Sequence, residues 1–131
     1  MIFELKAPIL GFEQIKQLEL KKIDDIFMRL QSVDAKEPSF TLINPFVLRD
    51  YEFDLPLTLQ ELLQIKEDSN LLIFNIVMIQ KPIENSTVNF VAPLIFNTDT
   101  QSMLQYIIND RFDYGVAEPV SAFLTQDGSD E

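Results

Sequence analysis

The chain has 131 residues, of which 47% are hydrophobic and 24% charged, as is ordinary for a single domain with its own core. It has no histidine and no cysteine, which excludes the usual zinc sites, histidine-activated serine or cysteine nucleophiles and histidine proton shuttles. A net charge of −11 argues against nucleic acid or an anionic membrane as a direct partner; it fits a soluble protein, and a basic protein partner is the alternative interpretation.

Four short strands are expected in the first third of the chain. Apolar and polar residues alternate in Ile2–Lys6, which predicts an edge strand. Similar patterns predict strands at Leu18–Leu20, Asp25–Ser32 and Phe40–Asn44. A turn cluster that ends at Pro38 separates the last two.

The run Asp50-Tyr-Glu-Phe-Asp54 alternates acidic and aromatic residues strictly. Successive side chains of an extended chain point to opposite faces, so the three carboxylates share one face and the two rings share the other. This pattern is typical of a strand with one solvated face above a core, and it predicts a strand at Tyr51–Leu55.

One helix is expected directly after this run. Thr58-Leu-Gln-Glu61 matches the capping box, in which a hydroxyl and a glutamate side chain satisfy the free amides of a helix start. Leucines at positions 59, 62 and 63 fall on one helical face. The helix is therefore expected to begin at Thr58 and to end near Glu67-Asp68.

The second half of the chain holds the most apolar segments. Leu71–Gln80 is apolar at almost every position and predicts a central strand. Gln101–Ile108 fits a strand or a helix, and we favour a strand paired with Leu94–Asn97. After Asn109 the pattern dissolves and leaves room for one further short helix or strand, and residues 125–131 are expected to form a frayed tail.

These elements together predict a mostly β fold. Short strands at regular spacing, many turns and one helix fit a small antiparallel β-barrel-like or sandwich domain, formed by residues 1–131 with a short capping helix. The even positions from 72 to 78 share one strand face, which we expect to be buried. The expected core is Phe27, Phe40, Leu42, Leu72, Phe74, Ile76 and Met78.

The apolar run Val88–Asn97 is unusual because Pro93 lies inside it and Asn89 and Asn97 bracket it. Proline cannot donate a ladder hydrogen bond, so a central strand should not contain it. Pro93 therefore indicates a strand end, an edge or a bulge. An apolar edge is a place where a partner protein can dock.

Three segments together resemble one known family. They are Ala7-Pro-Ile-Leu-Gly-Phe-Glu13, Ile43-Asn-Pro-Phe-Val-Leu-Arg-Asp-Tyr-Glu-Phe53 and Asn89-Phe-Val-Ala-Pro-Leu-Ile-Phe-Asn97. Their order, spacing and the chain length are similar to FliW, the flagellar assembly factor of bacteria. The resemblance covers nearly the whole chain and is weakest after Asn109.

The resemblance implies a closed β-barrel with a helical cap and a binding protein without enzymatic activity. It implies two partners, flagellin and CsrA, an RNA-binding translational repressor of flagellin messenger RNA. Free FliW-like protein would occupy CsrA and relieve repression, and accumulated flagellin would occupy FliW and restore it. A cytoplasmic location is expected, since the N-terminus lacks the pattern of a signal peptide.

Candidate protein-binding residues lie in the second and third of these segments. For the apolar residues of the Val88–Asn97 run, the residue types favour a place in the core over partner contact, and the asparagines fit turn capping equally well. No cofactor or metal is expected. The candidates are Asn44, Pro45, Phe46, Asn89, Phe90, Pro93 and Asn97.

Two other functions stay open from the residues alone. One is a generic acidic adaptor or chaperone-like module for a helical client. The other is an enzyme that uses carboxylates, such as Asp24-Asp25 or the acidic run at positions 50–54, for hydrolysis or for Mg²⁺ or Ca²⁺ binding.

Overall fold

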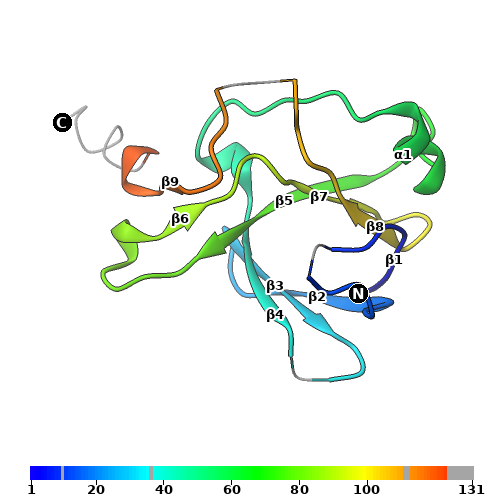
Figure 1. Ribbon diagram of the computed structural model, residues 1–131, viewed down its shortest axis with the longest axis horizontal. Helices are drawn as coiled ribbons and strands as arrows, with labels where there is room; N and C mark the ends of the chain where they lie inside the picture. Colours follow the sequence, from blue (N-terminus) through cyan, green and yellow to red (C-terminus); the bar gives the residue numbers. More distant parts are fainter. Residues whose placement is uncertain (10, 36, 111–112, 124–131) are drawn as a thin grey trace.

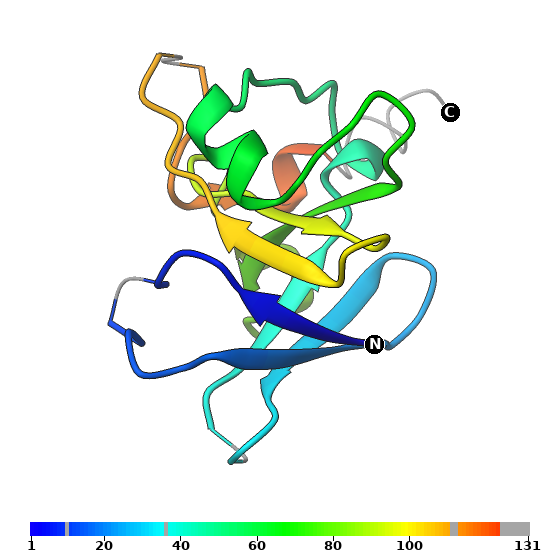
Figure 2. The ribbon, with the colours of Figure 1, turned by 90° about the vertical axis from the view of Figure 1, so that its right-hand side faces the viewer.

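The computed structural model describes residues 1–9, 11–35, 37–110 and 113–123, and the strands in these ranges form a barrel with a small second sheet attached (Figures 1 and 2). The expected tail at 125–131 lies outside the described residues. The strands are β1 (Ile2–Leu5), β2 (Gln17–Lys22), β3 (Phe27–Ser32), β4 (Ser39–Ile43), β5 (Leu71–Met78), β6 (Thr87–Val88), β7 (Leu94–Asn97), β8 (Ser102–Gln105) and β9 (Glu118–Pro119). The helices whose bounds both lie within the described ranges are α1 (Leu57–Leu62) and two 3₁₀ turns, η1 (Pro45–Val47) and η2 (Ile83–Asn85).

The barrel runs in the order β4-β3-β2-β1-β8-β7-β5 and closes where β4 pairs with β5. Its pairs are antiparallel except β1 with β8, which is parallel. The mostly β, barrel-like fold is thus as expected, including the pairing of β7 with β8. The expectation of an edge strand at Ile2–Lys6 is wrong, because closure gives β1 a partner on both sides.

Strand β5 belongs to both sheets. Its first half, Leu71–Phe74, pairs with β7, and its last two residues, Val77 and Met78, pair with β6. Strand β6 pairs in turn with β9, so the last described strand is joined to the barrel through β5. The apolar run Val88–Asn97 is therefore not one strand, because residues 89–93 separate β6 from β7.

The burial of the expected core residues depends on which part of β5 lies in the barrel. Leu42 and Phe74 are buried as expected, and Phe27, Phe40, Leu72 and Ile76 are partly buried. The expectation for Met78 is wrong, since 63% of it is exposed. The register places Ile76 opposite Leu42 of β4, while Met78 lies beyond the last β4 partner and so outside the barrel.

Helix α1 starts one residue before the expected position. Pro56 occupies the N-cap with no side-chain cap bond, so the expected capping box of Thr58 and Glu61 does not form. Proline is well suited to the start of a helix because its φ is fixed and its missing amide is not needed there. The Gln60 side chain instead donates to the Leu55 carbonyl at 2.7 Å.

The helix ends at Leu62, not near Glu67-Asp68. Leu63 caps it and is fully buried, Leu59 is partly buried, and Gln64 turns the chain with a φ of +54°. The chain turns here because Leu63 packs against Ile95 and Leu104 of the barrel wall.

The free energy of unfolding should depend strongly on the ring at position 96. Phe96 is fully buried and contacts the rings of Phe3 and Phe74 edge-on at centroid distances of 5.0 and 5.9 Å. We expect Phe96→Ala to lower the free energy of unfolding by about 3–5 kcal/mol in urea denaturation. Met78→Ala serves as the control, with an expected loss under about 1 kcal/mol. Similar losses for both variants would contradict this description of the core.

Candidate functional site

The candidate residues of the Asn44-Pro-Phe46 motif form η1 at the end of β4. The Asn44 side-chain oxygen accepts a hydrogen bond from the Phe46 amide at 3.0 Å, which caps this turn. Pro45 is buried at its first position. Phe46 is 53% exposed, with its ring centroid 6.3 Å from that of Tyr51. The motif therefore holds one large apolar side chain at the surface.

The second group lies in the segment between β6 and β7. The Asn89 side-chain oxygen accepts from the Val91 amide at 3.0 Å, and Phe90 is fully buried. Pro93 is buried immediately before β7 begins, and its carbonyl accepts from the Tyr106 amide at 3.0 Å. Pro93 is thus at a strand end, one of the positions that the sequence indicated.

Asn97 lies apart from the other candidates. It is fully buried at the end of β7, where its side-chain amide donates to the Leu63 carbonyl at 2.8 Å and its oxygen accepts from the Asp99 amide at 3.0 Å. It therefore ties the end of α1 to the barrel. Partner contact by the buried Phe90, Pro93 and Asn97 stays a prediction, and it would require neighbouring chain to move.

The hydroxyl of Tyr51 joins the first two groups of candidates. It donates to the Phe90 carbonyl at 2.5 Å and accepts from the Asn75 side-chain amide at 3.0 Å. The same Asn75 amide donates to the Asn89 carbonyl at 2.9 Å. Burial raises the pKa of the Tyr51 phenol well above its ordinary value of 10.0. The alternation of acidic and aromatic residues predicts that the Tyr51 ring faces the core. The partners of its hydroxyl are not visible in the sequence.

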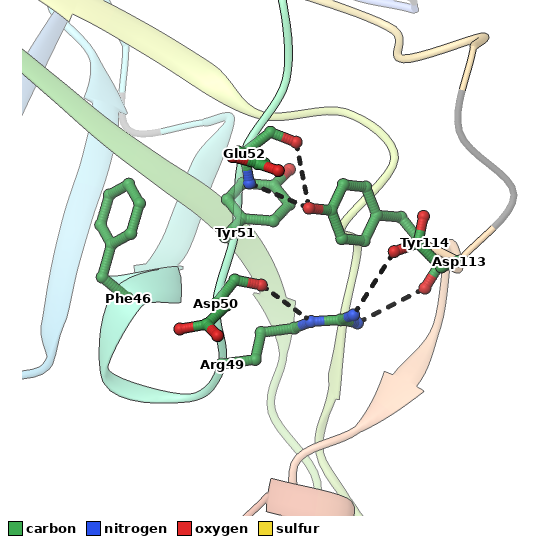
Figure 3. A pocket seen from close by; sticks show the side chains of 7 residues that line it. All are labelled: Phe46, Arg49, Asp50, Tyr51, Glu52, Asp113 and Tyr114. Atoms are coloured by element: carbon green, nitrogen blue, oxygen red, sulfur yellow. Dashed lines mark hydrogen bonds and ion pairs between the residues drawn. The ribbon is translucent and has the colours of Figure 1, made fainter.

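Arg49 attaches the last described segment to this region. Its guanidinium carbon lies 5.3, 4.8 and 5.7 Å from the ring centres of Phe90, Tyr114 and Phe123, within the range of cation–π attraction. One of its nitrogens is 3.1 Å from the Glu118 carboxylate. Another is 4.0 Å from the carboxylate of Asp113, the ion pair drawn in Figure 3. Sequence reasoning missed Arg49, because its partners are 64 and 69 residues away.

Two hollows lie against the segment that follows Arg49. A polar one of about 560 Å³ is lined by Phe46, Arg49, Asp50, Tyr51, Glu52, Asp113 and Tyr114 (Figure 3). A mainly apolar one of about 270 Å³ is lined by Phe46, Tyr51, Glu52, Phe53, Leu55, Gln60, Ile65, Leu71, Ile73 and Ile95. Phe46 borders both, so the exposed ring marks the middle of this surface.

This surface combines an exposed aromatic ring with two hollows of different polarity. The described residues include no group of three or more acidic side chains placed to hold a metal ion. With no histidine or cysteine in the sequence, the ordinary activated nucleophiles are excluded. The helices in the described part of the chain are too short or too polar to cross a bilayer. The fold and the site together define a small β-barrel with an exposed aromatic side chain between two surface hollows.

Comparison with known proteins identifies the family. The FliW protein family model matches residues 1–120. Flagellar assembly factor FliW 2 of Wolinella succinogenes is 50% identical over 131 residues, covering 98% of this chain and 96% of its own. Flagellar assembly factor FliW of Sulfurimonas denitrificans is 51% identical over 124 residues, covering 95% and 98%. The chain belongs to the FliW family of flagellar assembly factors.

A solved structure agrees with this assignment. The crystal structure of a flagellar assembly factor FliW superposes with a TM-score of 0.85 at 29% identity, and the match covers 91% of this chain and 84% of that one. The family is one of regulatory or adaptor proteins that work through protein partners.

Replacing the Tyr51 hydroxyl should weaken the fold in a pH-dependent way. Tyr51→Phe leaves the Phe90 carbonyl and one Asn75 proton without their partner, so we expect a loss of about 1–3 kcal/mol at neutral pH. Because the folded-state pKa lies above 10.0, wild-type stability is intact below pH 10 and falls as the pH rises beyond it. Urea denaturation between pH 8 and 11 should show a shallower fall for Tyr51→Phe, and parallel curves would contradict the role of this phenol.

Proposed function

We propose that this protein binds flagellin and a CsrA-type translational regulator, and that it antagonises CsrA repression of flagellin messenger RNA translation. The observation that carries the proposal is the family match over residues 1–120, with relatives named flagellar assembly factors over nearly their whole length. Free protein would hold CsrA away from the message. Flagellin that accumulates before export would occupy the protein and release CsrA.

The charge of the chain supports a regulator of an RNA-binding protein. A surface that binds a phosphate backbone is rich in Lys and Arg. A protein of net charge −11 attracts such a surface and steers the encounter. The same charge disfavours direct contact with nucleic acid or an anionic membrane. In this proposal CsrA acts on messenger RNA in the cytoplasm, so we expect the protein to act there too.

The proposed contact surface centres on Phe46. Among the candidates its side chain is the most exposed, and it borders both hollows. Aromatic side chains beside a hollow are the common anchors of protein interfaces. In this proposal Asn44 and Pro45 hold Phe46 in place, while Asn89, Phe90 and Pro93 support the surface from behind through Tyr51. Asn97 contributes through the position of α1.

Removing the Phe46 ring should weaken partner binding without weakening the fold. We expect Phe46→Ala to raise the dissociation constant for CsrA or flagellin by at least about tenfold, as anchors at interfaces do. Isothermal titration calorimetry with each purified partner measures this. Ile2→Ala is the matched control, because Ile2 is an exposed apolar residue of β1 on another part of the barrel. Unchanged affinity of Phe46→Ala for both partners would place the interface elsewhere.

Association with CsrA should slow as salt rises. Screening shortens the reach of the acidic field, whereas the apolar part of a contact is little affected. In stopped-flow experiments between 50 and 500 mM NaCl, we expect the association rate to fall by about tenfold or more and the dissociation rate to change much less. If the wild-type protein binds neither CsrA nor flagellin at low salt, the generic acidic adaptor becomes the better account.

A further inference from the structure

The segment Tyr51–Leu55 is extended, yet it is not part of either sheet (Figure 2). Its burial alternates as in a strand, with Tyr51 buried, Phe53 and Leu55 partly buried, and Glu52 and Asp54 exposed. One side chain takes the place of a neighbouring strand. The Tyr114 hydroxyl accepts from the Glu52 amide at 2.9 Å and donates to the Glu52 carbonyl at 3.0 Å (Figure 3).

The opposite edge of this segment has free main-chain groups. In a strand, the amide and carbonyl of one residue point to one edge, and those of the next residue point to the other. Glu52 points toward Tyr114, so Tyr51 and Phe53 point away from it. Within the described residues, no hydrogen bond engages the main-chain amides and carbonyls of Tyr51 and Phe53. Such an edge is a template for an added strand.

The apolar hollow lies along this free edge. Tyr51, Glu52, Phe53 and Leu55 of the segment line it, whereas Tyr114 does not. Its other lining residues are Phe46, Ile65 and residues of α1, β5 and β7. Phe46 projects on the side away from Tyr114 (Figure 3). The volume of about 270 Å³ compares with about 150 Å³ for an apolar cavity that binds benzene. The hollow therefore has room for apolar side chains of a bound peptide.

The outward face of the same segment is acidic. Asp50 and Asp54 are exposed, and Glu52 lies between them on the same face. The cation closest in sequence, Arg49, is engaged by Glu118 and Asp113. The pKa of the nearby Tyr106 phenol is raised, first by burial and then by the charges of Asp110 and Asp54, which is consistent with a local negative field.

We propose that the free edge of Tyr51–Leu55 binds an extended segment of a partner protein in which apolar residues alternate with Lys or Arg. Residues opposite each other on paired strands share a face. Side chains opposite Tyr51, Phe53 and Leu55 enter the apolar hollow, and the side chains that alternate with them meet the exposed carboxylates of Asp50 and Asp54. The main chain supplies affinity and the alternation supplies specificity, as in other cases of strand addition.

The alternating pattern and the acidic charge of the segment favour a basic extended peptide over two other occupants, a second copy of this chain and a helix. A second copy of this chain that added the same segment would set carboxylates opposite carboxylates, which destabilises a strand pair. A helix satisfies its own amides and leaves the free groups of Tyr51 and Phe53 unpaired. The proposal rests on the proposed function in one respect, that the ligand is a protein segment, and it does not require that CsrA or flagellin supplies it.

A synthetic peptide tests the proposal directly. The probe is a fluorescein-labelled, end-blocked peptide of the sequence Lys-Val-Lys-Phe-Lys-Val-Lys, titrated with the full chain in fluorescence anisotropy. Two comparison peptides have the same composition with the three apolar residues in one block, or Glu in place of Lys. Two further peptides are N-methylated at the odd or at the even positions, which removes the amides of one edge only.

The proposal expects a defined set of affinities. The alternating peptide should bind at least about tenfold more tightly than the blocked-order peptide, and the Glu peptide should not bind. One of the two N-methylated peptides should lose binding, because only one edge of the peptide pairs. Equal affinity of the alternating and blocked-order peptides, or no loss with either N-methylated peptide, overturns the proposal.

Matched charge reversals locate the site on the protein. Asp50→Lys with Asp54→Lys should weaken binding of the alternating peptide by at least about tenfold. Asp34→Lys with Glu37→Lys is the control, because it changes the net charge equally in the β3–β4 turn, far from the segment (Figures 1 and 2). Circular dichroism checks that both variants fold. Equal weakening by both pairs overturns the proposal, since it indicates attraction to the overall charge alone.

The same experiment separates this proposal from the proposed function. Binding of CsrA and flagellin by a protein that does not bind the alternating peptide overturns the strand-addition site alone. Binding of the peptide by a protein that binds neither CsrA nor flagellin overturns the proposed function alone and leaves this site in place.

Discussion

The pairing of β4 with β5 is the constraint on which the rest of the structure depends. It closes the barrel, and its register sets Ile43 opposite Asn75. The chain that leaves β4 as η1 is thereby placed beside β5, where Asn75 reaches both the Tyr51 hydroxyl and the Asn89 carbonyl. One strand pair thus brings together two motifs that are about forty residues apart in the sequence.

The strands of the barrel were predictable because each carries its own apolar pattern, and most boundaries agree within two residues. Features that depend on partners distant in the sequence were not predictable in this way. The alternation of Tyr51–Leu55 predicts a strand, but a strand also needs a neighbour, and here a tyrosine side chain takes that place. Met78 continues the apolar face of β5 beyond the point where β4 ends. Local pattern gives conformation, whereas tertiary pairing decides burial.

In the candidate site too, local chemistry explains some residues and contacts with distant parts of the chain explain the others. Asn44 and Asn89 cap turns, and Pro93 marks a strand end, as residues of these types do wherever they occur. The role of Asn97 in holding α1 depends on a carbonyl 34 residues away, which local chemistry does not specify. Arg49 is the clearest omission. Ten basic residues in an acidic chain give no sign of which one is surrounded by aromatic rings and carboxylates.

The attachment of residues 113–120 to Arg49 also sets an order of events during synthesis. On the ribosome the barrel strands, the last of which is β8, emerge before Glu118, and domains consolidate as their segments become available. Until Glu118 and Tyr114 have left the exit tunnel, Arg49 lacks its carboxylate and Glu52 lacks its hydroxyl partner. The surface around Phe46 is therefore among the last parts of a nascent chain to mature, so an unfinished polypeptide does not present it in final form.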